Sequence, residues 1–369
     1  MTELSPPVED HASFYSMLTK ALDGRYAAVI DARSDREYVE DHVPGALNLP
    51  VVDNDQYAEV GTMHRDDTHR AYLIGVSHAL KNISRAIDDL IGRYPKDSEF
   101  LVYCYRGGKR SKLWVDALTT IGYRVDRLPG GWKAYRAWVR GELERLPRTL
   151  VFNVLTGPTG CGKTRLLTAL ERVGAQVLDL EAMARHRGSL IGSLPGVSQP
   201  SQKWFDSLLL DKLRRFDPQK RVWVESESKK IGAIELPSAL METMRGGRVI
   251  AITAPMAERV KLWREDYRHF ETDPDALIQR LRHLTPLVGR EAMATWERLA
   301  AERRMPELFQ RLMETHYDPA YVRSINKNFP KYDQLPKLCL ERLDTESLSA
   351  VASDLHEDAR WLHHEALRV

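Results

Sequence analysis

The sequence predicts an α/β protein of two domains. The first is built on a parallel sheet with helices on both faces, and the second is an α/β domain with a helical C-terminal region. Two local patterns carry this prediction, and each consists of a short apolar run, a glycine-rich loop and a segment with helical spacing. The first pattern occupies residues 100–120 and the second occupies residues 151–173. Strand, loop and helix in this order are typical of parallel α/β sheets. A chain of 369 residues is long enough for two domains of ordinary size.

The two patterns are separated by a helical, arginine-rich stretch, Gly141–Arg148, which we expect to connect the domains. We therefore predict a first domain over residues 1–148 and a second over residues 149–369. After Ala257 the pattern indicates helices to the end of the chain and no further strand. Other apolar runs predict strands at 27–30, 176–180, 221–224 and 248–252.

Composition and charge narrow the class of protein. Hydrophobic residues make up 43% of the chain and charged residues 29%, and no run approaches the roughly 18 to 20 apolar residues of a membrane span. The first residues carry acids and prolines instead of a secretory signal, so we expect a cytoplasmic protein without a membrane partner. Three cysteines form no disulfide framework, and no CxxC pair indicates zinc. The formal charge of +2 neither demands nor excludes nucleic acid.

The loop of the first pattern begins with a cysteine and contains two glycines and three cations. Backbone N–H groups of a tight glycine loop, positive charges and a nearby helix start all favour a thiolate, which is the reactive form. A buried cysteine that acts as a small hydrophobe is the alternative, and the loop composition favours the reactive site. We predict that Cys104 is the catalytic nucleophile. The residues expected to support it are Arg106, Gly107, Gly108, Lys109 and Arg110.

Short motifs on both sides of this loop form a specific set. They are Asp31-Ala-Arg33, Glu37-Tyr38, the run from His42 to Asn48, and Leu128-Pro-Gly-Gly-Trp132. Together they resemble the rhodanese family over about the first 140 residues. The resemblance implies a rhodanese-like fold whose loop cysteine carries sulfur or selenium as a persulfide or perselenide. Phosphatases of this fold need a longer loop that ends in Arg, so the short loop favours a chalcogen carrier.

The loop of the second pattern, Gly157-Pro-Thr-Gly-Cys-Gly-Lys-Thr164, fits G-x-x-x-x-G-K-[ST] between a strand and a helix. In such a P-loop the backbone N–H groups surround a phosphate, the lysine adds a point charge and the threonine can reach magnesium. We predict a P-loop NTPase-like domain, with a chance glycine turn as the alternative. The expected phosphate-binding residues are Gly157, Gly160, Gly162, Lys163 and Thr164. We interpret Cys161 as a small filler of the loop.

What this P-loop binds is a separate question. An ATPase would normally have an apolar strand that ends in Asp, whereas the nearest candidate, 222–227, offers Glu225. This difference weakens a kinase or ATPase interpretation without excluding it. The segment after strand 176–180 lies where α/β sheets place their ligands, although an ordinary solvated loop is the alternative. The residues expected to contact the substrate are Asp179, Glu181, His186, Arg187 and Glu225.

Further segments extend the resemblance beyond these general motifs. They are Ala58–Thr62, Asp179–Ser189, Val222–Ser228 and His316–Ser324. With them, the chain is similar along essentially its whole length to the tRNA 2-selenouridine synthase family. One departure is His64, where the family often has an aromatic residue.

This resemblance implies a reaction in two steps on a wobble 5-substituted 2-thiouridine in the anticodon region of tRNA. The 2-sulfur is alkylated with a geranyl group from geranyl diphosphate, and selenium from selenophosphate then replaces the geranylated sulfur. The implied co-substrates are geranyl diphosphate and selenophosphate, and no tightly bound cofactor is implied. Whether magnesium binds at Thr164 is left open. The P-loop could hold the diphosphate as a leaving group, and Cys104 could carry the selenium.

The alternative function is a sulfurtransferase with an ATP-hydrolysing P-loop module, which would need no tRNA. The tRNA surface is also open, because the helical region after Ala257 mixes acids with its cations. It could track phosphates and stack a base with Trp263 and Tyr267, or it could be an ordinary solvated set of helices. Its basic residues are Arg259, Lys261, Arg264, Arg268, Arg280, Arg282, Arg290, Arg303 and Arg304.

Overall fold

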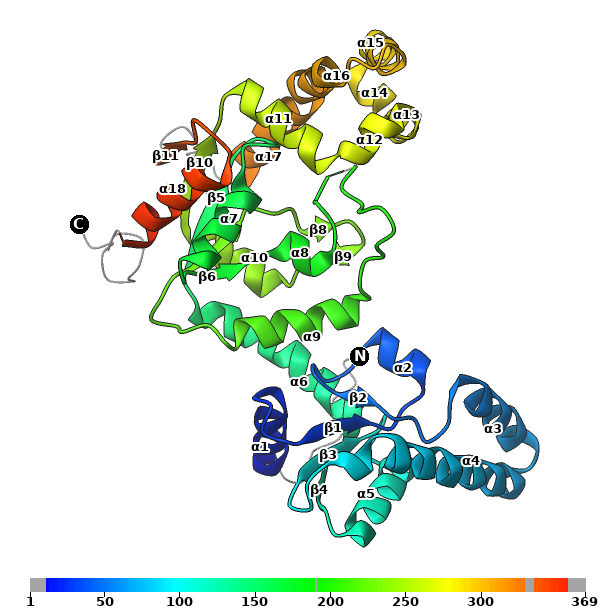
Figure 1. Ribbon diagram of the computed structural model, residues 1–369. Helices are drawn as coiled ribbons and strands as arrows, with labels where there is room; N and C mark the ends of the chain where they lie inside the picture. Colours follow the sequence, from blue (N-terminus) through cyan, green and yellow to red (C-terminus); the bar gives the residue numbers. More distant parts are fainter. Residues whose placement is uncertain (1–10, 190, 329–334, 358–369) are drawn as a thin grey trace. The chain divides into compact units, whose positions relative to one another are not determined.

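The computed structural model describes residues 11–189, 191–328 and 335–357 (Figure 1). The chain forms two compact units. Unit 1 contains Met1–Glu142 and Ser201–Asp211, and unit 2 contains Leu143–Pro200 and Lys212–Val369. The division near residue 142 lies close to the predicted boundary after Arg148. The segment Ser201–Asp211, however, packs with unit 1 although its place in the sequence is inside the predicted second domain.

Unit 1 is an α/β unit around a four-stranded parallel sheet in the order β2-β1-β3-β4. Its strands are β1 (Ala28–Asp31), β2 (Leu47–Asn48), β3 (Glu99–Tyr103) and β4 (Arg124–Arg127). Its helices are α1 (His11–Leu22), α2 (Asp35–Glu40), α3 (Asn54–Asp66), α4 (Thr68–Asp89), η1 (Ile91–Arg93), α5 (Lys109–Ile121) and most of α6 (Gly131–Arg145) and α9 (Gln202–Leu213). The predicted strand 27–30 and helix 111–120 are confirmed as β1 and α5.

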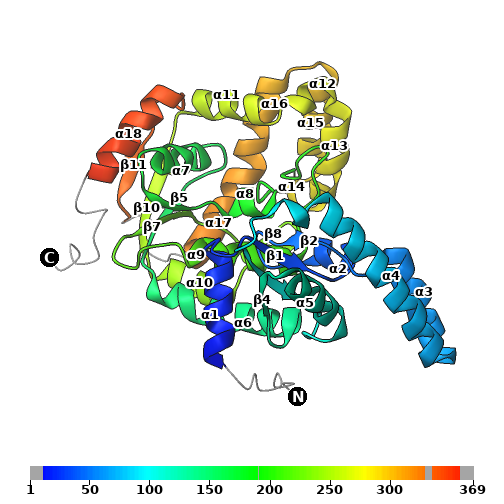
Figure 2. The ribbon, with the colours of Figure 1, turned by 60° about the horizontal axis from the view of Figure 1, so that its bottom comes forward.

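The long insertion after Pro50 forms the helix pair α3 and α4, which lie side by side in both views (Figures 1 and 2). A capping box starts α3, because Asp53 accepts a hydrogen bond from the Gln56 N–H and the Gln56 side chain accepts one from the Asp53 N–H. On α4, Ala79 and Ile83 are buried and join the core of the unit. The insertion is therefore an integral part of unit 1.

The segment Ser201–Asp211 is held to unit 1 by a buried polar network. The Asp41 carboxylate accepts hydrogen bonds from Ser207 Oγ at 2.7 Å and from Trp132 Nε1 at 2.8 Å. Arg136 on α6 donates to Asp206 at 2.8 Å. These residues are far apart in the sequence, so no local pattern could have assigned the segment to this unit.

Unit 2 is also an α/β unit, with a five-stranded parallel sheet in the order β11-β10-β5-β7-β6. Its strands are β5 (Phe152–Thr156), β6 (Gln176–Leu178), β7 (Val222–Glu225), β10 (Arg248–Thr253) and β11 (Lys337–Cys339), with a separate antiparallel pair β8 (Lys230–Ile231) and β9 (Ile234–Glu235). All five residues of β5 are buried, as expected for a central parallel strand covered on both faces. The predicted strands at 221–224 and 248–252 are confirmed as β7 and β10. The strand predicted at 176–180 is present as β6 but ends at Leu178, because Leu180 already begins α8.

The helices of unit 2 form two groups. Beside the sheet lie η2 (Leu146–Thr149), α7 (Lys163–Arg172), α8 (Leu180–Ala184), α10 (Ser238–Arg245) and α18 (Thr345–Glu357). The second group is α11 (Met256–Asp266), α12 (Arg268–Thr272), α13 (Pro274–Leu281), η3 (Arg282–Leu284), α14 (Thr285–Val288), α15 (Arg290–Ala301), α16 (Met305–Leu312), η4 (Met313–Tyr317) and α17 (Asp318–Asn328). This group packs around its own apolar core, which includes Trp263, Trp296 and Phe309.

The prediction that no strand follows Ala257 is wrong. Strand β11 pairs in parallel with β10 at the edge of the sheet, with Ile252 opposite Leu338. It has only three residues, of which Lys337 and Cys339 are exposed. So short an edge strand has no periodicity of its own, and the pairing with β10 alone defines it.

Candidate functional sites

The first site is the Cys104 loop of unit 1, between strand β3 and helix α5. Cys104 follows β3 directly and is 3% exposed. Its Sγ accepts a hydrogen bond from the Gly108 N–H at 3.2 Å and lies 3.3 Å from Ser111 Oγ. A backbone donor and a hydroxyl thus converge on the sulfur at the N-terminal turn of α5. Ser111 was not among the predicted support residues, although its place in the first turn of the predicted helix was a usable signal.

Two glycines allow the chain to close tightly around this loop. Gly107 has φ of +66°, and a Cβ atom there would lie 2.9 Å from the carbonyl oxygen of Leu128. Gly131 has φ of +57°, and a Cβ atom there would clash with the Cys104 carbonyl. This close approach lets the N–H of Trp132 donate to the Cys104 carbonyl at 2.9 Å. The glycine-tryptophan segment therefore fixes the backbone of the cysteine loop.

The three cations of the loop have different partners. Arg110 forms a bidentate ion pair with Glu37, at 2.6 and 3.2 Å. The Lys109 ammonium lies 3.8 Å from the ring centroid of Tyr72, and the Arg106 guanidinium lies 5.8 Å from that of Tyr105. Their electrostatic support of the sulfur stays a prediction.

The second site is the P-loop of unit 2, between strand β5 and helix α7. Gly160 and Gly162 have φ of +78° and +88°, which favour glycine. The Lys163 Nζ donates to the carbonyl oxygen of Gly157 at 2.9 Å, so the lysine folds back over the loop. Cys161 is fully buried, and burial raises the pKa of its thiol. These properties support the interpretation of Cys161 as a filler and not a nucleophile.

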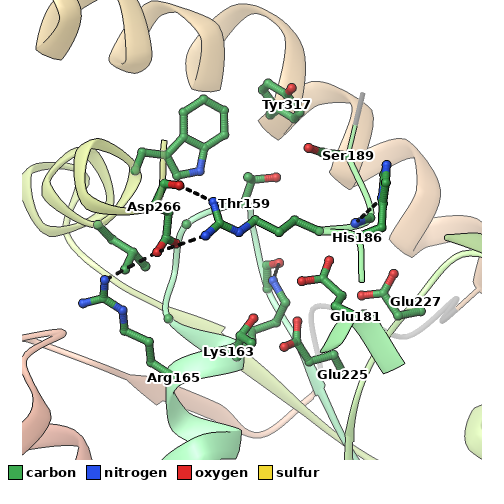
Figure 3. A pocket seen from close by; sticks show the side chains of 18 of the residues that line it. Thr159, Lys163, Arg165, Glu181, His186, Ser189, Glu225, Glu227, Asp266 and Tyr317 are labelled. Atoms are coloured by element: carbon green, nitrogen blue, oxygen red, sulfur yellow. Dashed lines mark hydrogen bonds and ion pairs between the residues drawn. The ribbon is translucent and has the colours of Figure 1, made fainter. Parts of the chain in front are cut away.

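The P-loop opens into a pocket of about 610 Å³ (Figure 3). All ten residues predicted for phosphate binding or substrate contact in this domain line that one pocket. They are Gly157, Gly160, Gly162, Lys163, Thr164, Asp179, Glu181, His186, Arg187 and Glu225. Because β7 neighbours β5 in the sheet, Glu225 lies where the strand order would place the Asp of an ATPase. What these residues bind stays a prediction.

Three glutamates make one side of the pocket strongly acidic: Glu181, Glu225 and Glu227 (Figure 3). Burial, followed by the charges of Glu225 and Glu227, raises the pKa of Glu181 to about 9. Burial and the charge of Glu225 raise the pKa of Glu227 to about 8, and burial also raises the pKa of Glu225. The positive charge of Lys163 opposes each shift. Glu227 was not among the predicted site residues, although it lies two positions after Glu225.

Aromatic side chains form another side of the same pocket. Trp263, Tyr267 and Tyr317 line it, with ring centroids of Tyr267 and Tyr317 at 5.3 and 5.0 Å from that of Trp263. A Cβ atom at Gly160 would lie 3.0 Å from Trp263 Cδ1, so the aromatic side directly adjoins the P-loop. The pocket therefore joins the P-loop to a side lined by aromatic rings.

The idea that Trp263 and Tyr267 stack an exposed tRNA base on a helical surface is wrong. They are 2% and 5% exposed, because they belong to the apolar core of the second helix group. Arg259 is also buried; it pairs with Asp318 at 2.6 Å and donates to the Thr159 carbonyl of the P-loop at 2.8 Å. Several remaining cations pair with acids, as Arg282 does with Glu297 at 3.3 Å. The tRNA surface itself stays unassigned.

Among the described residues, no set of three or more His, Cys, Asp or Glu side chains is placed to hold a metal ion. A magnesium contact at Thr164 remains a prediction. In the same described part of the chain, none of the helices has the length and apolar character that a membrane span needs.

Comparison with known proteins assigns a family to each unit. Residues 14–137 match the family described as a rhodanese-like domain, and residues 150–276 match the tRNA 2-selenouridine synthase AAA domain. The tRNA 2-selenouridine synthase of Nitrosomonas europaea is 35% identical over 70% of this chain and 67% of its own length. That of Bdellovibrio bacteriovorus is 30% identical over 81% of this chain and 89% of its own length. For Nitrosomonas eutropha the identity is 34% over 63% of this chain and only 61% of the relative.

The loop cysteine of one unit and the P-loop pocket of the other define an enzyme with a rhodanese-like domain and a P-loop domain. The relatives specify this class further. The chain belongs to the tRNA 2-selenouridine synthase family.

Proposed function

We propose that this chain converts a wobble 5-substituted 2-thiouridine of tRNA to 2-selenouridine. The sulfur is first alkylated with the geranyl group of geranyl diphosphate, and diphosphate leaves. Selenium from selenophosphate then replaces the geranylated sulfur, with loss of geranyl thiol and, after hydrolysis of the P–Se bond, of phosphate. The names of the relatives support selenouridine formation in tRNA. The geranyl route and the two co-substrates rest on the pocket and on the chemistry below.

The observation that carries the first step is the composition of the pocket in unit 2. Geranyl diphosphate has an anionic end and an apolar end, and the pocket offers a P-loop beside Trp263, Tyr267 and Tyr317. Lys163 and the P-loop N–H groups would stabilise the charge that develops on the departing diphosphate. The aromatic side chains that line the pocket would contact the hydrocarbon part of the ligand.

The observation that supports the second step is the environment of Cys104. Its sulfur lies at the first turn of α5 and accepts a hydrogen bond from Gly108. A helix N-terminus and a backbone donor favour negative charge on sulfur or selenium at this position. We therefore assign selenium handling to Cys104. The alkylation is needed beforehand because a thiocarbonyl sulfur is a poor leaving group, whereas an S-alkyl group leaves as a neutral thiol once protonated.

The alternative function, a sulfurtransferase with an ATP-hydrolysing P-loop, makes different demands on the same pocket. ATP hydrolysis normally depends on an Asp at the end of the strand beside the P-loop strand. In this pocket the corresponding position, beside Lys163, is Glu225. This difference favours a diphosphate as leaving group over ATP turnover.

The test is transfer of radiolabelled geranyl from geranyl diphosphate to 2-thiouridine tRNA by the wild type and by Lys163→Ala. We expect the variant to lose the label on tRNA by about 10²-fold or more, because it removes the point charge at the leaving group. Lys203→Ala, which removes an exposed ion pair with Glu40 in unit 1, serves as the matched control and should retain transfer. ATP turnover by the wild type that depends on Lys163, without geranyl transfer, would favour the alternative function.

A further inference from the structure

Two carboxyl groups from different elements converge in the pocket of unit 2. Glu181 lies in helix α8, and Glu227 follows strand β7. Gly188 lies between them: a Cβ atom added there would be 2.7 Å from Oε1 of Glu181 and 3.2 Å from Oε2 of Glu227. Figure 3 shows both carboxyls beside each other at the pocket. A single donor group of a ligand could therefore contact both.

The neighbouring Glu225 gives an independent sign that a ligand donor belongs here. Its side chain is 6% exposed and lines the pocket, and its Oε1 has no hydrogen-bond partner among the described residues. A buried polar atom without a partner costs about 1–3 kcal/mol. The diphosphate cannot supply the missing donor, since its oxygens are acceptors. A part of the ligand that carries an N–H or O–H group would supply the missing partner.

The charges around the pair define its protonation. Glu181 is surrounded by Glu225, Glu227, Asp179 and Lys163, and Glu227 is surrounded by Glu225, Asp179 and Lys163. On the loop between them, His186 Nδ1 accepts the Gly188 N–H at 3.1 Å. Neighbouring buried carboxyls cannot easily ionise together, so the pair holds its protons to a higher pH than free carboxyls do. A carboxyl of the pair can act as a base once it has lost its own proton.

On the basis of the proposed function, we propose that Glu181 and Glu227 act together as the base that takes the N3 proton of 2-thiouridine while its sulfur is geranylated. In this step the bond between geranyl C1 and the diphosphate oxygen breaks, and its electron pair leaves with the diphosphate. The sulfur uses a lone pair to bond C1. The N3–H proton passes to a carboxylate, and the electron pair of that bond forms the C2–N3 double bond. The π electron pair of the former C2–S double bond moves onto the sulfur, so the S-geranyl product is neutral. The step needs no oxidant or reductant.

The location of the pair follows from the P-loop. A diphosphate held by Lys163 and the loop places geranyl C1 at the Lys163 side of the pocket. Because N3 and the sulfur are bonded to the same carbon, a base for N3 must lie beside this reacting end. Glu181 and Glu227 line the pocket together with Lys163, and Glu225 adds a buried acceptor for the base. The pair therefore also favours a substrate with an N–H next to the thiocarbonyl.

The test uses the full chain, 2-thiouridine tRNA and geranyl diphosphate without selenophosphate. Single-turnover S-geranylation is measured from about pH 6 to 10 for the wild type, Glu181→Gln, Glu227→Gln and the double variant. Glu235→Gln, which changes an exposed glutamate paired with Lys229 at 2.8 Å, is the matched control. Affinity for a non-reactive thio analogue of geranyl diphosphate is measured in parallel, so that binding is separated from chemistry.

We expect the double variant to lose about 10²-fold or more in the rate of alkylation, the usual size of a general-base contribution. Its affinity for the analogue should be retained or improved, since a neutral amide repels the diphosphate less than a carboxylate. The wild-type rate should rise with pH as the two carboxyls lose their protons, because their raised pKa values are about 9 for Glu181 and about 8 for Glu227. This rise should be absent in the double variant.

The possible outcomes distinguish a failure of the base assignment from a failure of the proposed function. A wild type that geranylates tRNA, with Gln variants of unchanged rate and unchanged pH profile, overturns the base assignment and leaves the proposed function intact. A wild type that forms no S-geranyl uridine overturns both the base assignment and the proposed function. If a variant fails to fold, the wild-type pH profile still decides, because a rate independent of pH over this range contradicts a base of this kind.

Discussion

Gly131 packs directly against the carbonyl of Cys104, at a distance that excludes any side chain at residue 131. We predict that Gly131→Ala displaces the cysteine loop, because the added Cβ meets backbone and the φ of +57° strains any L side chain. Selenium incorporation should fall sharply, and unit 1 should lose roughly 1–3 kcal/mol of stability. The control is Gly141→Ala on the same helix, where a Cβ meets nothing within 4 Å. It should be neutral or stabilise by about 0.5–1 kcal/mol. Equal behaviour of the two variants in thermal unfolding would contradict this role of Gly131.

The two sites should be separable by mutation if the proposed function is correct. We predict that Cys104→Ala abolishes selenium incorporation and leaves S-geranylation largely intact, because the pocket that alkylates lies in the other unit. Cys339→Ala is the control, since that cysteine is exposed and far from either site in the sequence. Nucleoside mass spectrometry of tRNA measures both products. Full selenation by a purified Cys104→Ala variant would remove Cys104 from the mechanism.

Arg33 and Asp31 form a buried ion pair at 2.6 Å, with side chains 1% and 0% exposed. Removing only the cation leaves a carboxylate buried without its partner, so Arg33→Ala should destabilise unit 1 by about 3–5 kcal/mol. The exposed pair of Arg25 with Asp23 provides the comparison, with side chains 59% and 38% exposed. Arg25→Ala should cost at most about 1 kcal/mol. Denaturant unfolding of both variants checks the difference, and comparable losses would contradict the argument from burial.

Asp41 should make the stability of unit 1 depend on pH. Burial raises its pKa from 3.8 to about 6, against the opposing effects of Ser207 and Arg136. The folded state thus binds the proton more tightly than the unfolded chain. Its contribution to stability is fully present below 3.8 and is lost as pH rises to about 6. Between these values the wild type should lose stability relative to Asp41→Asn. A constant difference between the two proteins over that range would show that Asp41 does not titrate as described.

The parts of this protein that the sequence predicts are those that depend on neighbouring residues. The strand, loop and helix around Cys104 and around Lys163 are local, because glycines at special φ angles and apolar runs specify them. The ten residues predicted around the P-loop line one pocket because they end or follow strands whose carboxyl ends meet at one edge of the sheet.

The remaining features depend on contacts between distant residues. Trp263 lies on α11, which carries many charges, and Tyr267 lies in the turn after it. Only the packing of the helix group shows that both are buried. Glu181 and Glu227 lie near each other because they follow β6 and β7, which are neighbours in the sheet. Ser207 reaches Asp41 across 166 residues of sequence. The hydrophobic periodicity of the sequence gives no signal for such long-range contacts.

The most direct test of the central claim is mass spectrometry of nucleosides from 2-thiouridine tRNA incubated with the purified chain. With geranyl diphosphate alone, we predict S-geranyl-2-thiouridine; with geranyl diphosphate and selenophosphate together, we predict 2-selenouridine at the wobble position. Selenophosphate alone should leave 2-thiouridine unchanged, because the unalkylated sulfur is a poor leaving group. Formation of 2-selenouridine without geranyl diphosphate, or of no modified nucleoside under any of these conditions, would contradict the account.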